Sequence, residues 1–485
     1  MKHLLIFEAK NPFSAFVAFT LAAFCWGAVA GYAYGQEVVP HEQTPIVLQA
    51  SEAVPAKLLK SEYHQVADRV VNDGYMNHYE IETPYGTFTA EGNAALRIRI
   101  KEIDALAQLE DVTKTKAFAD ALKRSATSQG RAIAETVQHP VESAKGIPGG
   151  VSRFVKRTAR KAKDLKKDGE EGYQEVKEYQ EKKKAEKAEE AAGQDSQTET
   201  PPDEKSTIEQ GQEWWDEKGE DYAKKGAEIA KDQSKDWIGY TDARRHWAKE
   251  LEVDPYTDNA VLSKELHRVA QAATAGDFAM RWVPVPHLEV LGTMGDVNDL
   301  VWDTNALDLR MRNEKLLYGM GASEELVEAL YDNDHQSPTL IMVLVDALTQ
   351  LDGVEGRVFW IEHAASSESR IESEFHLRAV NFFAAYHEQK RPLASVVNGR
   401  LYPSGLTTDG RLVLVAPVDH LHWTEDIAEV IEVSTARLGD RTGAEIFEGW
   451  IEGGCSDNTL RALEGLGYEV HTNSFLGLNV TFGEE

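Results

Sequence analysis

The sequence predicts an α+β protein of several domains that is mainly helical. It also predicts a small parallel α/β unit at the C-terminus and a charged helical or disordered spacer in the middle. Three observations predict this fold class. In many segments apolar residues recur every three or four positions, as on one face of a helix. After Pro392 the pattern becomes strand–helix–strand–helix–strand, which favours parallel strands joined by right-handed crossovers. Residues 168–206 consist mostly of charged, small and polar residues, as solvated helices and disordered linkers do.

Length, composition and charge exclude several classes of protein. A chain of 485 residues is long enough for two or three domains. Its hydrophobic fraction of 42% excludes a fully disordered or collagen-like chain. Two cysteines are too few for a disulfide scaffold. The net charge of −29 keeps the protein soluble and disfavours nucleic acid as a partner.

Residues 1–35 are predicted to be a secretory signal peptide. No charge occurs from Pro12 to Tyr34, Lys2 and Lys10 precede this apolar run, and small residues at 28–30 and 33–35 suit a signal peptidase. The alternative is an uncleaved membrane anchor, because about 20 apolar residues can span a bilayer. We therefore expect a protein that is secreted or that stays in the periplasm or cell envelope.

Residues 36–147 are predicted to form an N-terminal module of a hairpin and helices. β-forming residues at 79–83 and 87–89 flank a turn at Pro84–Gly86. From Leu96 to Leu109 the apolar residues recur with helical spacing.

Residues 148–235 are predicted to contain a basic amphipathic helix, a charged spacer and a disordered linker. Residues 151–167 carry a net charge of +7, and their apolar residues share one helical face. Such a helix binds an anionic membrane surface or an acidic protein surface. The alternative is a helix whose charges pair with the protein's own acidic residues. The residues expected to contact the partner are Arg153, Lys156, Arg157, Arg160 and Lys161.

A single line of a heptad follows within the same segment. Ile208, Trp215, Tyr222 and Ile229 recur every seven residues, which indicates at most a thin coiled-coil seam.

Residues 236–392 are predicted to be a helical block, and residues 393–485 the small α/β unit. Ser337 and Pro338 mark the start of a helix that runs to Leu351. One long helix is expected from Phe359 to Tyr386. In the C-terminal unit, strands are expected at 412–415, 446–451 and 468–470, and helices after the capping residues Thr424 and Ser456.

The densest polar cluster, residues 419–426, follows the first of these strands. Ligands bind at this position in parallel α/β folds. Asp419, His420 and His422 are therefore candidate ligands of a divalent metal ion, although no third, remote ligand can be identified. The alternative is structural, because Thr424 suits a helix cap and acidic residues favour the positive end of a helix. No other cofactor is expected.

A second candidate lies after the next strand. Cys455 and Ser456 follow two glycines at the start of a helix, where a cysteine can become nucleophilic. Together with His420 and His422 they are the candidate catalytic residues. The alternative is an ordinary strand-to-helix turn with a serine cap.

One signature resembles a known group of proteins. It comprises Trp237–Tyr240, Ala243–Arg245 and Val253–Thr257, and it is similar to an uncharacterised family of exported bacterial proteins. The resemblance extends from about His64 to the end of the chain. It implies export and a single architecture, and it brings no activity, ligand or catalytic residue.

Two functions follow as expectations. The first is a non-enzymatic, envelope-associated protein that docks or tethers. The alternative is a hydrolase-like enzyme with its site at the strand ends of the C-terminal unit. The sequence does not predict the oligomeric state.

Overall fold

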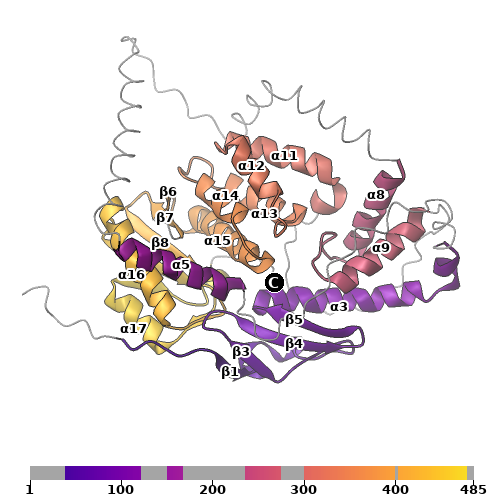
Figure 1. Ribbon diagram of the computed structural model, residues 1–485, viewed down its shortest axis with the longest axis horizontal. Helices are drawn as coiled ribbons and strands as arrows, with labels where there is room; N and C mark the ends of the chain where they lie inside the picture. Colours follow the sequence, from indigo (N-terminus) through magenta and orange to yellow (C-terminus); the bar gives the residue numbers. More distant parts are fainter. Residues whose placement is uncertain (1–38, 122–149, 168–234, 275–299, 399–401, 478–485) are drawn as a thin grey trace, which may run out of the picture. The chain divides into compact units, whose positions relative to one another are not determined.

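The computed structural model describes residues 39–121, 150–167, 235–274, 300–398 and 402–477 (Figure 1). The chain divides at Pro40, and the elements below all belong to the part that begins at His41. The predicted signal peptide, the spacer and linker at 168–234 and the heptad line lie outside the described residues. In the described ranges no helix combines the length and apolarity that a membrane span requires.

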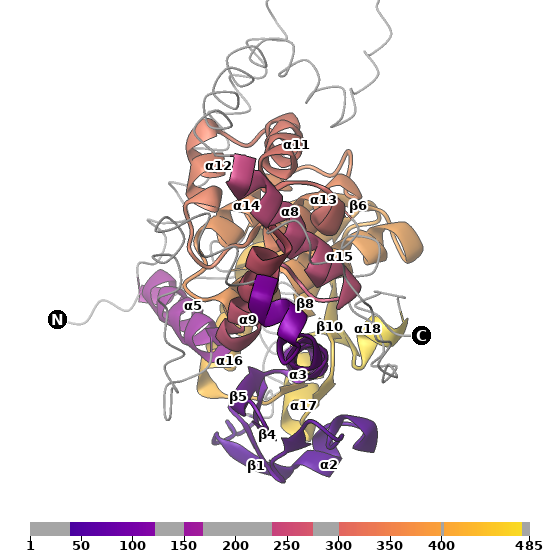
Figure 2. The same ribbon diagram turned by 90° about the vertical axis from the view of Figure 1, so that its right-hand side faces the viewer.

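The N-terminal sheet is a curled, antiparallel half-barrel of five strands (Figure 2). Strand β4 pairs with β5 along one edge and with both β3 and β2 along the other. The predicted hairpin at 79–89 is confirmed, and its register places His78 opposite Glu91. The strands are β1 (Ile46–Gln49), β2 (Gln65–Val66), β3 (Arg69–Asn72), β4 (Asn77–Thr83) and β5 (Gly86–Glu91).

Helix α3 (Asn93–Thr113) confirms the helix predicted at 96–109 and joins two cores. Its first half buries Leu96, Ile100 and Ile103 against the N-terminal sheet, where the short helices α2 (Ala50–Ala53) and η1 (Ala56–Leu58) also pack. Its second half packs against α8 (Lys235–Glu250) and α9 (Ala260–Thr274). Asn259 caps α9 by accepting hydrogen bonds from the amides of Val261 and Leu262.

The helical block forms a third core with one face of the C-terminal sheet. The predicted cap at Ser337 is confirmed, since its Oγ accepts the Leu340 amide. The prediction of one long helix at 359–386 was wrong, because Ser369 caps a new helix and ends the continuity. The helices are α11 (Ala306–Gly319), α12 (Glu324–Tyr331), α13 (Pro338–Thr349), α14 (Val358–Ala365) and α15 (Arg370–Gln389).

The C-terminal sheet is mixed, with strand order β12-β10-β8-β7-β6. Strands β8, β10 and β12 are parallel, as predicted, whereas β6, β7 and β8 are antiparallel. The strands are β6 (Leu393–Asn398), β7 (Pro403–Thr407), β8 (Arg411–Ala416), β10 (Ile446–Ile451) and β12 (Tyr468–His471). Helix α16 (Glu425–Thr442), capped by Thr424, and helix α17 (Asp457–Gly465), capped by Ser456, connect the parallel strands, and α18 (Ser474–Gly477) follows β12.

The predicted fold class was therefore wrong. The described residues form a mixed α/β protein with three sheets, which is not mainly helical, and its C-terminal unit is not a purely parallel one. Apart from the β4–β5 hairpin, the antiparallel strands were missed, because β1, β2 and β3 are short and because Pro403 and Gly405 in β7 are atypical of strand interiors.

Candidate functional sites

Residues 419–424 join the C-terminal sheet to the N-terminal module. The amides of Asp419 and His420 donate to the carbonyl oxygen of Tyr75, and the amide of His422 donates to that of Gly74. The amide of Glu42 donates to the carbonyl oxygen of Trp423 at 2.8 Å. The predicted polar cluster is therefore first of all a docking segment for the N-terminal module.

The Asp419 carboxylate is the centre of this junction. It accepts hydrogen bonds from the backbone amides of Asn77, at 2.8 Å, and Asn93, at 3.0 Å. Asn93 is the first residue of α3, so Asp419 also caps that helix from another part of the chain. Burial raises the pKa of Asp419, while the two amides oppose that rise. Both oxygens are thus engaged by the backbone rather than turned toward a metal ion.

His420 and His422 lie together beside Glu42. Their rings are 4.6 Å apart between centroids, and His422 Nδ1 is 3.6 Å from Glu42 Oε2. Burial lowers the pKa of both histidines, and the Glu42 charge opposes that change. Among the described residues, they do not form a group of three metal-ligating atoms within 4.8 Å of one another, so the predicted trio with Asp419 is not assembled as a metal site.

Cys455 and Ser456 do come close to the histidine segment. The short strands β9 (His420–Leu421) and β11 (Gly454–Cys455) pair in parallel, with Gly454 opposite His420. Ser456 Oγ donates to Glu42 Oε2 at 2.5 Å and accepts the Thr459 amide as the cap of α17. Burial, followed by the charges of Asp457 and Glu42, raises the pKa of the Cys455 thiol. An activated nucleophile requires the opposite shift.

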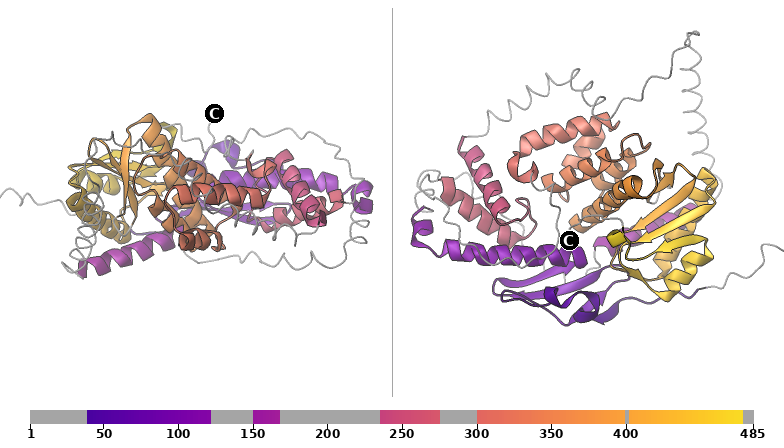
Figure 3. Two further views of the ribbon diagram at one scale, coloured as in Figure 1. Left: turned by 90° about the horizontal axis from the view of Figure 1, so that it is seen from above. Right: turned by 180° about the vertical axis from the view of Figure 1, so that it is seen from behind.

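The basic segment forms helix α5 (Gly150–Lys167), which packs against α16 and α15 (Figures 1 and 3). Arg157 forms ion pairs with Glu372 and with Glu368, the latter at 2.6 Å, and Lys163 pairs with Glu425 at 2.8 Å. The other four residues predicted to bind a partner remain exposed; they are Arg153, Lys156, Arg160 and Lys161. We call the residues Glu368, Glu372 and Glu425 the acidic seat of α5.

The apolar face of α5 is buried. Phe154 lies edge to face against the His376 ring, with 5.1 Å between ring centroids, and also meets Phe375. Val151, Ala159 and Ala162 are almost completely buried. A cavity of about 100 Å³ remains between α5, α16 and the C-terminal sheet; its apolar lining includes Phe154, Val155, Ile427, Ile431, Val415 and Trp450.

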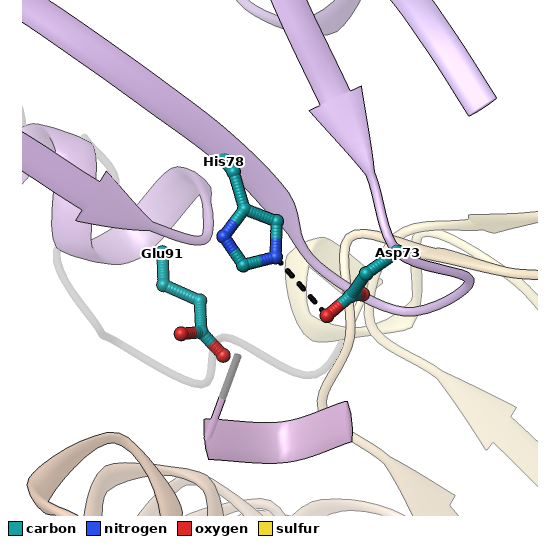
Figure 4. A group of neighbouring side chains, drawn as sticks. All are labelled: Asp73, His78 and Glu91. Carbon is teal, nitrogen blue, oxygen red and sulfur yellow. Dashed lines mark hydrogen bonds and ion pairs between the residues drawn. The ribbon is translucent and has the colours of Figure 1, made fainter. Parts of the chain in front are cut away.

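A further group of side chains was missed from the sequence. Asp73, His78 and Glu91 each direct one metal-ligating atom into a space where these atoms lie within 4.8 Å of one another (Figure 4). His78 Nε2 is 3.0 Å from Asp73 Oδ2, and Glu91 accepts the Val151 amide at the start of α5. The signal that can identify the group is the hairpin register, which pairs His78 with Glu91.

No family model, no curated protein and no solved structure matches this chain. The resemblance around Trp237 therefore stays a prediction.

Proposed function

We propose that this is an exported, envelope-associated docking protein without catalytic activity, and that its docking element is helix α5. In this proposal, the acidic seat and the apolar surface beside it form a binding site for a basic amphipathic helix. Helix α5 of the same chain occupies this site. Recognition of an amphipathic helix in an apolar groove is a recurrent mode of protein binding.

The observation that carries the proposal is the double engagement of α5. Its apolar face is buried, with Phe154 among the aromatic rings of α15, and its Arg157 reaches the buried carboxylate of Glu372. A buried carboxylate that loses its cationic partner carries a substantial desolvation cost. The seat is therefore selective for a helix that offers both an apolar stripe and a cation at the position of Arg157.

The geometry favours an acidic protein surface over a lipid surface as the partner of α5. A helix that binds an anionic membrane must present its apolar face to the lipid, whereas Val151, Phe154 and Ala162 are buried here. While α5 occupies the acidic seat, four of its basic residues stay exposed and can bind a second acidic partner: Arg153, Lys156, Arg160 and Lys161.

Hydrogen exchange of the full-length protein tests the seating of α5. Arg157→Ala should speed the exchange of amides 151–163 by tenfold or more, because it leaves Glu372 without its cation. Arg160→Ala is the matched control, because Arg160 is an exposed residue of the same helix and its Nε donates to the carbonyl oxygen of Lys156 in that helix. Equal exchange rates in the two variants would show that the acidic seat does not hold α5 in place.

Liposome flotation separates the two partners predicted from the sequence. The wild-type chain should not float with vesicles of anionic lipid, whereas Arg157→Ala, which loosens α5, should bind them more than Arg160→Ala does. Wild-type flotation that fades with salt would instead identify the membrane as the resting partner of α5.

Export is the second part of the proposal. It is supported by the uncharged run from Pro12 to Tyr34. N-terminal sequencing of the protein from its native host should find a first residue between Gly31 and Glu37. Retention of Met1 would contradict cleavage and favour the anchor.

An enzyme is the second candidate function, and the convergence of Glu42, His422 and Ser456 favours it. A fluorophosphonate probe tests this reading, because it labels serines activated by a neighbouring base. Labelling of the wild type that is lost in both Ser456→Ala and His422→Ala would establish the enzyme. We expect no labelling, since Ser456 donates its hydrogen bond to a carboxylate and caps α17.

A further inference from the structure

The hairpin of β4 and β5 places three ligating side chains around one point. His78 and Glu91 are opposite each other in the register, so their side chains lie on the same face of the sheet. Asp73 lies in the turn between β3 and β4. Figure 4 shows the carboxylates of Asp73 and Glu91 below the imidazole ring of His78, on either side of a shared space.

The separation of these atoms suits a transition metal. Ligands bind zinc at about 2.0–2.2 Å, so two ligands 3.0 Å apart subtend roughly a right angle at such an ion. His78 Nε2 and Asp73 Oδ2 are separated by this distance. One ligating atom from each of Asp73, His78 and Glu91 lies within 4.8 Å of the other two. A small rotation of one carboxylate therefore completes a three-ligand site that leaves positions open for water.

The negative charges around the site favour the binding of a cation. The charges that act on His78 belong to the carboxylates of Asp73, Glu91 and Asp419. Glu91 is half-buried and accepts the Val151 amide through Oε1. A carboxylate offers about four acceptor sites, so Glu91 can accept this amide and still coordinate an ion.

We propose that Asp73, His78 and Glu91 bind one divalent transition-metal ion of the zinc or manganese type. One imidazole and two carboxylates form a donor set that suits these ions, whereas magnesium and calcium prefer oxygen ligands alone. Because Glu91 also receives the first amides of α5, the ion fixes the point at which α5 begins. That last consequence rests on the proposed function of α5; the metal site itself does not.

The experiment is calorimetric titration of the full-length, chelator-treated protein with zinc chloride. The wild type should bind one equivalent, and His78→Ala should weaken that binding by at least about tenfold. His246→Ala, which removes an exposed histidine of α8, is the matched control and should bind like the wild type. Magnesium chloride at the same concentration should not compete.

A second variant distinguishes the loss of a metal ligand from the loss of the folded structure. Glu91→Gln keeps an oxygen for the Val151 amide but is a poor metal ligand, so it should lose zinc affinity while the circular dichroism spectrum stays unchanged. Binding of equal strength in wild type, His78→Ala and Glu91→Gln would overturn the proposal, and so would the absence of binding to the wild type.

The consequence for α5 is measured separately. Zinc should slow the hydrogen exchange of amides 151–155 in the wild type and not in His78→Ala. Zinc binding through His78 with no change in this exchange would remove the link to α5 and leave the metal site in place. Failure of the acidic seat instead appears as an unchanged exchange in Arg157→Ala, with zinc binding retained.

Discussion

The backbone amide of Asn77 donates a hydrogen bond to the Asp419 carboxylate across 342 positions of sequence, with 2.8 Å between the two atoms. The other Asp419 oxygen accepts the amide of Asn93. One carboxylate thereby joins strand β4, helix α3 and the end of the C-terminal sheet.

Asp419→Asn should lower the free energy of unfolding by about 1–3 kcal/mol. The new NH₂ group is a donor and would face a backbone amide that now donates a hydrogen bond to the Asp419 carboxylate. Asp419→Ala should cost more, since it leaves both buried amides without a partner. Urea unfolding measures both changes. Asp68→Asn, at an exposed aspartate of the N-terminal module, is the control and should be neutral. Equal stability of Asp419→Asn and the control would mean that solvent satisfies the two amides.

Gly150→Ala should displace the start of α5. A Cβ atom at this position would lie 2.5 Å from Ser369 Oγ and 3.0 Å from Ile371 Cβ. We expect a loss of about 1–3 kcal/mol from overpacking, which exceeds the gain of up to 1 kcal/mol in helix propensity. Gly465→Ala in α17 is the matched control, because its Cβ would meet nothing within 4 Å. The measurement is urea unfolding with hydrogen exchange of amides 151–155; a stabilised Gly150→Ala would contradict the close approach.

Asp104→Asn should stabilise the protein at neutral pH. Burial raises the pKa of Asp104 to about 6, so ionisation of this group in the folded state is unfavourable. Its contribution to stability is complete below the ordinary value near 4 and is lost as the pH rises through 6. The variant should therefore gain about 1–2 kcal/mol at pH 7, a figure reduced for solvent screening, and nothing at pH 3.5. Chemical unfolding at both pH values measures this; an equal effect at both would show that Asp104 does not titrate as described.

Cys455 should react slowly with thiol reagents. The thiolate is the reactive form, and burial with the charges of Asp457 and Glu42 raises the pKa of Cys455 above its ordinary value of 9.0. In a Cys25→Ser background, the rate with a disulfide reagent should still be rising at pH 9.5. The reaction rate of the urea-unfolded protein should reach its plateau at a lower pH. A folded-state rate that is already constant by pH 8 would favour the enzyme.

Local signals predicted most single elements of the C-terminal half. Ser337, Thr424 and Ser456 each cap the helix that follows, because a hydroxyl can accept an amide of the first turn in almost any surroundings. Strand β8 contains the continuous apolar run Leu412–Val415, which is typical of a buried strand in a parallel sheet.

What was missed depends on contacts between distant residues. Gly405 suits β7 because a Cβ there would lie 2.8 Å from the Phe383 ring, a contact that no local pattern contains. The same holds for the sites. His420 and Cys455 were candidate catalytic residues because each follows a strand of the C-terminal unit, but Glu42 is 414 positions from Ser456 and carries no signal of its own. The pairing of Arg157 with Glu372 likewise needs two helices to be placed first.

The junction at Asp419 has a consequence for the order in which the chain acquires its structure. Asn77 is synthesised 342 residues before Asp419, the residue whose carboxylate accepts its amide. Contacts of such sequence separation slow folding, because a long loop must close before they form. The N-terminal module therefore lacks its contacts with residues 419–422 until that segment has been made.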